Sequence, residues 1–544
     1  MYRLTLVVTV AIRLKAAESG YVDSATCRPC HSEIFDAYAR TGMGRSFDRV
    51  SNQAEVAARP VDFFHQASGS RYTLRRGNGG ELMMRHAETG VQAWVDWIVG
   101  SGNHSRTLLH TKPSGKLAEL PLSWYADKGG HWAMSPGYDR RDHSGFRRDI
   151  SDGCLFCHNA YPSAINRGVG TGIDCQRCHG PGEEHSRIVN PAKLPRSRRL
   201  EVCLQCHLET GSRSTPDAIR RYDRGAFSYR PGEPLSDFQI YFEPAAGPAP
   251  DAITVNGAGS GLLRSKCYQA TGGAMTCVAC HDPHGVRRID ANAVCANCHK
   301  SAHGGELRNC VACHMPKRRT EDAVHVVMTD HRILRRPPPG DPLAPRKERH
   351  DRYSGPVALF YPRLPGADVA IRAYLAIAQG DPRQLADAIA RMPNAHAGFH
   401  FELARIEQQS GRLRGAARHY QVAIERSPDH VPAIVALAEL LLSMGNSGEA
   451  KRLLSRSKAE HPDLLNALAV AEVAQGRYRE AEAVLRQAVR LDDWMPITHV
   501  NLGVALEAQG DRVAAAAAYR RALALQPDLD RARQLLDTIG RNQP

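Results

Sequence analysis

The sequence CVACHDPHGVRRIDANAVCANCHKSAHGGELRNCVACH, residues 277–314, repeats the pattern Cys-x-x-Cys-His three times. This pattern is the attachment motif of c-type haem: two thiols form thioethers with the porphyrin, and the histidine that follows ligates the iron. The order matters because two tethers fix the ring, and the histidine must follow at once to reach the metal. Three motifs in so short a segment predict haems that lie close to one another.

The same motif occurs four more times between residues 27 and 207, so the chain has seven motifs, which use every cysteine except Cys267. A single copy also fits a zinc or redox site, but zinc ribbons have no reason to place a histidine after every second cysteine. Cys267 is interpreted as a buried free thiol, with a sulfur linked to a substrate or to iron as the alternative. We therefore predict seven covalently bound haem c groups, with the thioether cysteines Cys27, Cys30, Cys154, Cys157, Cys175, Cys178, Cys203, Cys206, Cys277, Cys280, Cys295, Cys298, Cys310 and Cys313, and the proximal iron ligands His31, His158, His179, His207, His281, His299 and His314.

Enough further histidines precede residue 354 to give every haem a second, distal histidine. His284 lies too close to His281 to reach the same iron, so we expect it to ligate a neighbouring haem. A Gly-Pro-Gly turn before His185 can direct that side chain back towards a haem. The predicted distal ligands are His65, His104, His185, His284, His303, His325 and His331, with His143, His131 and His110 as alternatives.

The composition is that of a basic chain with few aromatic residues: 544 residues, a net charge of +14 and 6% aromatic residues. Seven haems would bring up to two propionates each, and the arginine excess is interpreted as their counter-charge. Nucleic acid is therefore excluded as a partner. We expect a core in which macrocycles act as packing units and regular secondary structure is sparse.

Residues 1–20 contain a short apolar run after Arg3, which predicts a signal or export segment. The run is too short to span a bilayer, and no later stretch does so. Because c-type haem is attached outside the bacterial inner membrane, the predicted location is the periplasm or the cell exterior, including the cell surface. A haem domain is expected over 21–335. It would include a small β-containing insert at 50–150, where RYTLRR and ELMMRH flank a Gly-rich turn, and a surface excursion at 211–265.

A basic, Pro-rich linker is expected at 336–365, and residues 366–544 then show helical periodicity with an internal repeat. Glycines recur every 31 to 34 residues, each followed five residues later by alanine and four residues after that by Tyr or Leu. This register resembles the tetratricopeptide repeat (TPR), with a capping helix from about Asp528. The repeat glycines are Gly411, Gly445, Gly476 and Gly510, and Gly380 suggests a degenerate first unit.

Four segments resemble multihaem cytochromes c of the cytochrome c-554 and hydroxylamine oxidoreductase class: CQRCHGPGEEH, MTCVACHDPH, CVACHMPK and CRPCHSEIFDAY. The resemblance covers residues 21–335. It implies haems in stacked pairs, mostly ligated by two histidines, that carry electrons, with His185 and His284 at distal-ligand positions. The lysine-ligated motif of ammonia-forming nitrite reductases is missing from this sequence.

The expected fold is mainly α: a haem-packed cytochrome domain followed by an α-solenoid. The function predicted first is electron transfer between redox partner proteins docked through the repeats. Because the repeats begin soon after His314, the end of the haem chain at 277–314 is expected to face that partner. One alternative is an oxidoreductase that acts on a small nitrogen or sulfur compound at a haem without a distal ligand. A second alternative is a structural subunit of a larger complex or oligomer.

Overall fold

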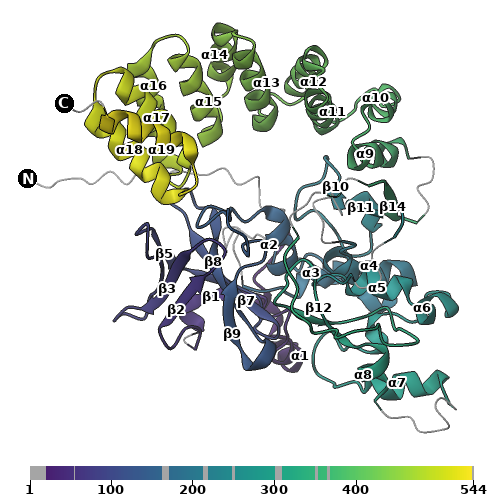
Figure 1. The fold of residues 1–544 in the computed structure, drawn as a ribbon. Helices are drawn as coiled ribbons and strands as arrows, with labels where there is room; N and C mark the ends of the chain where they lie inside the picture. The colour runs from purple at the N-terminus through teal and green to yellow at the C-terminus, as the bar shows by residue number, and fades with distance from the viewer. Residues whose placement is uncertain are drawn as a thin grey trace, which may run out of the picture.

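The computed structural model describes residues 20–53, 55–161, 171–211, 218–247, 252–300, 309–349, 353, 355–363 and 368–541. The export segment predicted at 1–20 lies outside these residues, apart from Gly20, and so does His303. A mixed body holds the Cys-x-x-Cys-His motifs, and an arc of helices lies over one side of it (Figure 1). None of the described helices is both long and apolar enough to cross a bilayer.

The insert predicted at 50–150 holds more strands than the single predicted hairpin, because the described residues from 47 to 134 form two antiparallel sheets. The predicted hairpin is confirmed: Ser70–Arg76 pairs with Leu82–His86. Alternating apolar residues of both sheets meet in one core, in which Leu74, Ile98 and Leu122 are fully buried. The sheets run β2-β3-β4-β5 and β1-β6-β7-β8-β9, with β1 Phe47–Arg49, β2 Val61–His65, β3 Ser70–Arg76, β4 Leu82–His86, β5 Gln92–Val95, β6 Trp97–Val99, β7 Ser105–Thr111, β8 Leu117–Tyr125 and β9 His131–Met134.

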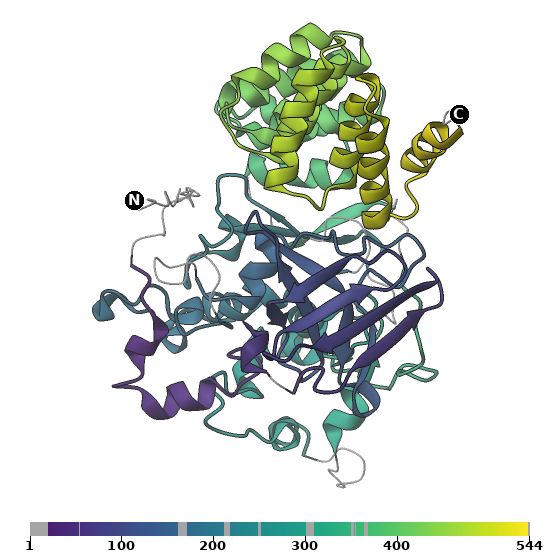
Figure 2. The ribbon, with the colours of Figure 1, turned by 90° about the vertical axis from the view of Figure 1, so that its left-hand side faces the viewer.

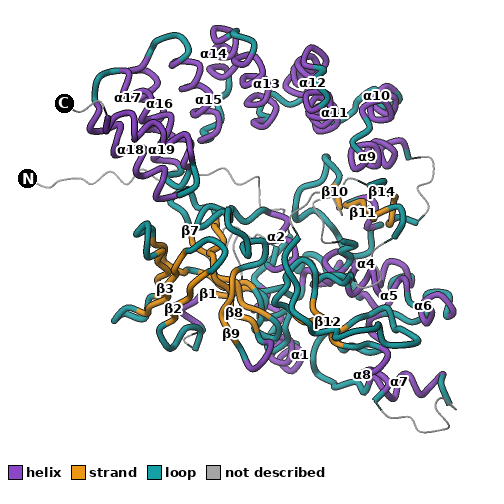
Figure 3. The backbone as a smooth tube through the Cα atoms, viewed as in Figure 1, coloured by secondary structure: helices purple, strands orange, loops and turns teal. Residues whose placement is uncertain are grey.

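The motifs themselves lie on short helical segments joined by long loops, as the loop colour around them in Figure 3 shows. In several of them the motif histidine is the last residue of its helix, so the helix end sets its position. The segments are η1 Ser24–Cys27, α1 Ser32–Tyr38, α2 Asp152–His158, α3 Gln176–His179, α4 Arg196–His207, η7 Cys277–Ala279, α7 Ala291–Cys298 and α8 Cys310–His314.

The prediction that residues 211–265 form a long surface excursion is wrong. Its described part contributes β10 (Ala218–Arg220), β11 (Gln239–Pro244) and α5 (Ala258–Arg264). β11 pairs with β14 (Val357–Tyr361), a strand within the segment predicted as a linker. Ile240 and Phe242 of β11 are fully buried. The sequence did not predict these strands for two reasons. The apolar residues are interspersed with glycines and prolines, and the partner strand β14 lies more than a hundred residues away, so the pairing leaves no local pattern.

The C-terminal region is a helical solenoid that follows the predicted register. The four repeat glycines end their helices at φ values of 73–87°, which glycine adopts without strain. The alanines five residues later, such as Ala416 and Ala481, are fully buried between paired helices. The helices are α9 Val369–Gln379, α10 Pro382–Ala390, α11 Ala397–Gln409, α12 Leu413–Arg426, α13 Val431–Ser443, α14 Ser447–Arg456, α15 Pro462–Val473, α16 Tyr478–Leu491, α17 Pro496–Ala508, α18 Arg512–Leu525 and α19 Asp530–Arg541.

Both ends of the solenoid contact the body. At one end, Tyr374 of α9 packs on Tyr222, with ring centroids 5.2 Å apart. At the other end, Trp494 enters the core of the β-sheets, 5.8 Å from Phe146. The solenoid therefore arches over the body between two anchors (Figures 1 and 2).

The prediction that residues 277–314 face a partner docked on the repeats does not fit the position of this segment. α7 and α8 lie at the end of the body farthest from the repeats, in both views (Figures 1 and 2). Closeness in sequence misled the prediction, because β12 (Lys317–Arg319), β13 (Val327–Thr329) and β14 carry the chain back across the body before α9 begins.

Candidate functional site

The motif cysteines come together across motifs. The thiols lie close enough to interact in three pairs: Cys27 with Cys175, Cys157 with Cys206, and Cys203 with Cys277. All cysteines are free. We number the seven motifs in chain order, by their first cysteines Cys27, Cys154, Cys175, Cys203, Cys277, Cys295 and Cys310. Motif 1 thus lies beside motif 3, and motif 4 lies beside motifs 2 and 5.

The last motifs continue this series. The Cys295 thiol of motif 6 interacts electrostatically with thiols of motifs 7 and 5, Cys310 and Cys280, and with Cys267. The backbone N–H of Val311 donates to the Asn292 side chain at 3.0 Å, which ties α8 to α7. The Gln205 side chain of motif 4 donates to the Arg177 carbonyl of motif 3 at 3.2 Å, so the seven Cys-x-x-Cys-His motifs form one connected series.

Three motif histidines face a second histidine at almost constant separation. The ring centroids are 6.3 Å apart for His31 and His185, with planes 17° from parallel. The other two pairs have centroids 5.9 Å and 6.2 Å apart. Two imidazole nitrogens, each about 2 Å from a metal between them, place the ring centroids about 6 Å apart. The pairs are His31 with His185, His179 with His284, and His281 with His331.

Backbone carbonyls orient several of these rings. Nδ1 of His179 donates to the Val189 carbonyl at 2.9 Å, and Nδ1 of His331 to the Thr329 carbonyl at 2.9 Å. In motif 7, Nδ1 of His314 donates to a carbonyl at 2.7 Å. Such a bond fixes the tautomer and leaves the lone pair of Nε2 available to a metal.

Partial burial keeps several of these imidazoles neutral. It lowers the pKa of His158 to about 4, and His207 nearby adds to the effect. Partial burial also lowers the pKa of His179 and His331. A neutral ring carries the lone pair that iron ligation needs, so these side chains are ready ligands at neutral pH.

The structure places two of the predicted distal ligands around a carboxylate in the β-region. His65 Nε2 lies 3.1 Å from Asp139, and His325 Nε2 lies 3.7 Å from the same carboxylate. Hydrogen bonds from His325 and His65 hold the pKa of Asp139 well below its usual range. A third predicted ligand, His104, hydrogen-bonds the Val327 backbone. Within the described ranges, no three His, Cys, Asp or Glu side chains are gathered so that they could hold one metal ion.

The segment around motifs 5 to 7 has no core of its own. None of the described residues in 266–300 and 309–315 is buried. Segments of this size that lack a hydrophobic core need a disulfide, a metal or another bound group to hold a fold. Free cysteines, histidine pairs at metal-spanning distances and a missing apolar core together fit a large, apolar, iron-containing group such as haem.

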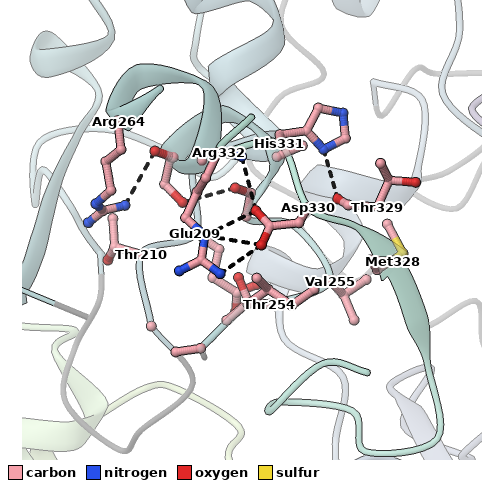
Figure 4. A pocket seen from close by; sticks show the side chains of 17 residues that line it. Glu209, Thr210, Thr254, Val255, Arg264, Met328, Thr329, Asp330, His331 and Arg332 are labelled. Carbon is pink, nitrogen blue, oxygen red and sulfur yellow. Dashed lines mark hydrogen bonds and ion pairs between the residues drawn. The ribbon is translucent and has the colours of Figure 1, made fainter. Parts of the chain in front are cut away.

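A small pocket lies behind the loop that carries His331 (Figure 4). Its floor is Asp330, 1% exposed, whose carboxylate accepts from Arg318 at 3.0 Å and from Arg332 at 2.7 Å. The His331 ring points away from this cluster (Figure 4). Gly261 of α5 packs so closely that a Cβ would lie 3.3 Å from the His331 Cβ. Asp330 and Gly261 therefore position His331, a role that the sequence did not reveal.

Comparison with known proteins places the C-terminal region in a repeat family. Two family models of the tetratricopeptide repeat match residues 407–471 and 466–530. Cellulose synthase 1 operon protein C of Komagataeibacter xylinus is 27% identical over 162 residues, which are 28% of this chain and 12% of that protein. Cellulose synthase operon protein C of Komagataeibacter sucrofermentans is 26% identical over 152 residues, 27% of this chain and 12% of that protein. The chain thus spans 12% of the length of these relatives.

Two solved structures are similar to part of this chain. MamA from Desulfovibrio magneticus RS-1 matches with a TM-score of 0.27 and 17% identity, over 30% of this chain and 95% of that one. The TPR protein TTC0263 of Thermus thermophilus matches with a TM-score of 0.26 and 20% identity, over 31% and 94%. The repeat assignment rests on the family models and on the buried register described above. TPR solenoids commonly bind proteins, so the C-terminal region is an interaction or assembly module.

Proposed function

We propose that this chain is an exported heptahaem cytochrome c that transfers electrons, with its repeats docking a protein partner. The observation that carries the proposal is the connected series of seven motifs with three facing histidine pairs at 5.9–6.3 Å. Haem iron supplies one-electron chemistry by changing between the ferric and ferrous states. Covalent haem attachment would require the chain to mature outside the inner membrane, in the periplasm or beyond.

The chain's own residues would hold and tune that group. The cysteines would tether it, the paired histidines would close both axial positions, and closed positions favour electron transfer over binding of a small substrate. Distal ligation by His185, His284 and His331 is part of this proposal. The proposal keeps His104, His303, His65 and His325 as candidate ligands of the other motifs, with His65 and His325 released from Asp139.

Replacing a distal histidine should open one haem. His331→Ala is expected to convert one low-spin ferric haem to a high-spin haem that binds cyanide, because the sixth ligand is lost while both tethers remain. Electron paramagnetic resonance with magnetic circular dichroism measures this change. His110→Ala is the matched control, since His110 bonds the Trp94 carbonyl and Asp96 instead. A His331→Ala spectrum identical to that of the wild type would refute the assignment.

The same spectroscopic measurement on the wild-type protein distinguishes an electron-transfer protein from a catalytic oxidoreductase. An all-low-spin spectrum, unchanged by cyanide or nitrite, supports electron transfer. A high-spin haem in the wild type that binds either ligand would instead indicate an oxidoreductase acting on a small nitrogen or sulfur compound.

The repeats offer a defined docking pocket for the proposed partner. Its floor is apolar and comes from the first turns of α13, including Val431 and Val435. Glu439 and Asp463 supply its charge, and burial together with Asp463 raises the pKa of Glu439. Two acids beside an apolar floor, one of them 3.5 Å from the His461 ring, favour a partner segment that combines apolar and basic side chains.

A charge and shape test follows from this pocket. A synthetic peptide that alternates Leu and Lys is expected to bind the haem-loaded protein, and Val435→Lys should weaken it about tenfold by placing a positive charge on the apolar floor. Isothermal titration calorimetry measures the affinity. Met444→Lys, at an exposed helix end 50% accessible to solvent, is the control. Equal binding of a Leu–Glu peptide would contradict the proposed charge preference.

An assembly role for the repeats is the second candidate. The relatives that match are operon proteins of cellulose synthase, and they are more than eight times as long as the matched segment. Deleting residues 355–544 separates the two: complexes that survive the deletion would show that the repeats are not the assembly device.

A further inference from the structure

Arg177 is a fully buried cation inside a haem-attachment motif. It lies between Cys175 and Cys178 of motif 3, and only 1% of its surface is exposed. Its guanidinium carbon is 4.2 Å from the ring centroid of Phe156 and 4.4 Å from that of Tyr161. Stacking of this kind suits a guanidinium in an apolar site, but it leaves the charge in place.

Among the described residues, no carboxylate forms a direct ion pair with this guanidinium, and Asp174 acts on it only through a longer-range electrostatic interaction. Nη2 donates to the Phe156 carbonyl at 2.6 Å, while Nε and Nη1 have no hydrogen-bond partner. The nearby acid, Asp174, accepts from the Arg177 backbone N–H at 3.2 Å and from the Gln176 side chain at 3.0 Å. Buried charges are normally paired because desolvation is costly. A buried guanidinium without a direct ion pair, inside a haem-attachment motif, therefore calls for a function.

The charge acts on three motifs at once. Its field reaches the Cys157, Cys178 and Cys206 thiols, one from each of motifs 2, 3 and 4. These thiols are the proposed attachment points, and the interior around them has a low effective dielectric. The cations near motifs 5 and 6, such as Arg287 and Lys300, are exposed, so water and salt screen them.

We infer that Arg177 raises the reduction potential of the haems at the junction of motifs 2, 3 and 4 above that of the exposed end at 277–314. The inference rests on the proposed function. Reduction adds one electron and removes one positive charge from the iron, so a fixed cation nearby stabilises the reduced form. No bond is made or broken, and the electron comes from a one-electron donor protein or a chemical mediator. Electrons that enter at the exposed end would then collect at the junction.

Spectroelectrochemical titration of the haem-loaded full-length protein tests this. Arg177→Met keeps the bulk and removes the charge, so the ratio of reduced to oxidised haem at the highest-potential step should fall at least about tenfold, or about 59 mV for one electron. Arg177→Lys keeps the charge and should keep the ratio within about threefold. Arg287→Met removes an exposed cation and should leave the step unchanged. An unchanged titration of a seven-haem Arg177→Met protein would overturn the inference.

Wild-type protein provides a second readout if the Met variant does not fold. The highest potential should change less with ionic strength than the lowest, because a buried charge is not screened. A highest potential that follows salt as strongly as the lowest would equally overturn the inference. Failure of the proposed function looks different, since a wild-type protein without covalent haem shows no haem reduction at all.

Discussion

Protein made without haem attachment is expected to lose its folded structure around motifs 5 to 7. No described residue of 266–300 or 309–315 is buried, so side chains alone supply no hydrophobic stabilisation there. Hydrogen-exchange mass spectrometry should show amide exchange at least about a hundredfold faster in these ranges than in the haem-loaded protein, which is roughly 3 kcal/mol of local stability.

Two regions of the same chain serve as internal controls. The β-sheets have their own core, in which Leu74, Leu82 and Ile98 are fully buried. The solenoid buries Ala416, Ala450 and the other repeat alanines. Both should keep most of their protection without haem. Equal protection of 266–300 in the two preparations would mean that haem is not the core of this segment.

Lys112→Ala is expected to cost about 3–5 kcal/mol, because it leaves a buried carboxylate unpaired. Lys112 is 3% exposed, and its ammonium lies 2.6 Å from Asp149 and 3.2 Å from Asp492. Asp492, also 3% exposed, begins the turn that inserts Trp494 into the β-sheet core. Losing the pair should therefore loosen the anchor of the solenoid. Urea denaturation followed by circular dichroism gives the stability, and hydrogen exchange at 492–508 gives the local effect.

Two variants make this prediction specific. Lys116→Ala removes a cation 46% exposed and 3.7 Å from Asp149, and should change stability by less than about 1 kcal/mol. The double change Lys112→Met with Asp492→Leu replaces the buried pair by apolar groups and should recover most of the loss. A loss below about 1 kcal/mol for Lys112→Ala would show that this pair does not anchor the solenoid.

The Cys-x-x-Cys-His motifs and the repeat register could be identified from the sequence because each is a local pattern. A haem tether needs two cysteines and a histidine at fixed spacing, and a TPR needs glycine and alanine at fixed steps. Gly411, Ala416 and Tyr420 accordingly occupy the turn and core positions that the register predicted.

Contacts between distant parts of the chain left no such signal. Nothing around Lys112 predicts Asp492, which is 380 residues away. The predicted distal ligands show the same limit. A Gly-Pro-Gly turn pointed to His185 and closeness to His281 pointed to His284, and the structure places these two opposite His31 and His179. His65 was predicted alongside them but bonds Asp139. Arg177 was overlooked because the two residues between the motif cysteines are variable by definition.

Intact-protein mass spectrometry of the full-length chain, produced in a host that attaches c-type haem, tests the central claim most directly. The account predicts one species that carries seven covalent haems, with Cys267 left as the free thiol. A chain without covalent haem, or one in which the motif cysteines bind zinc, would contradict it.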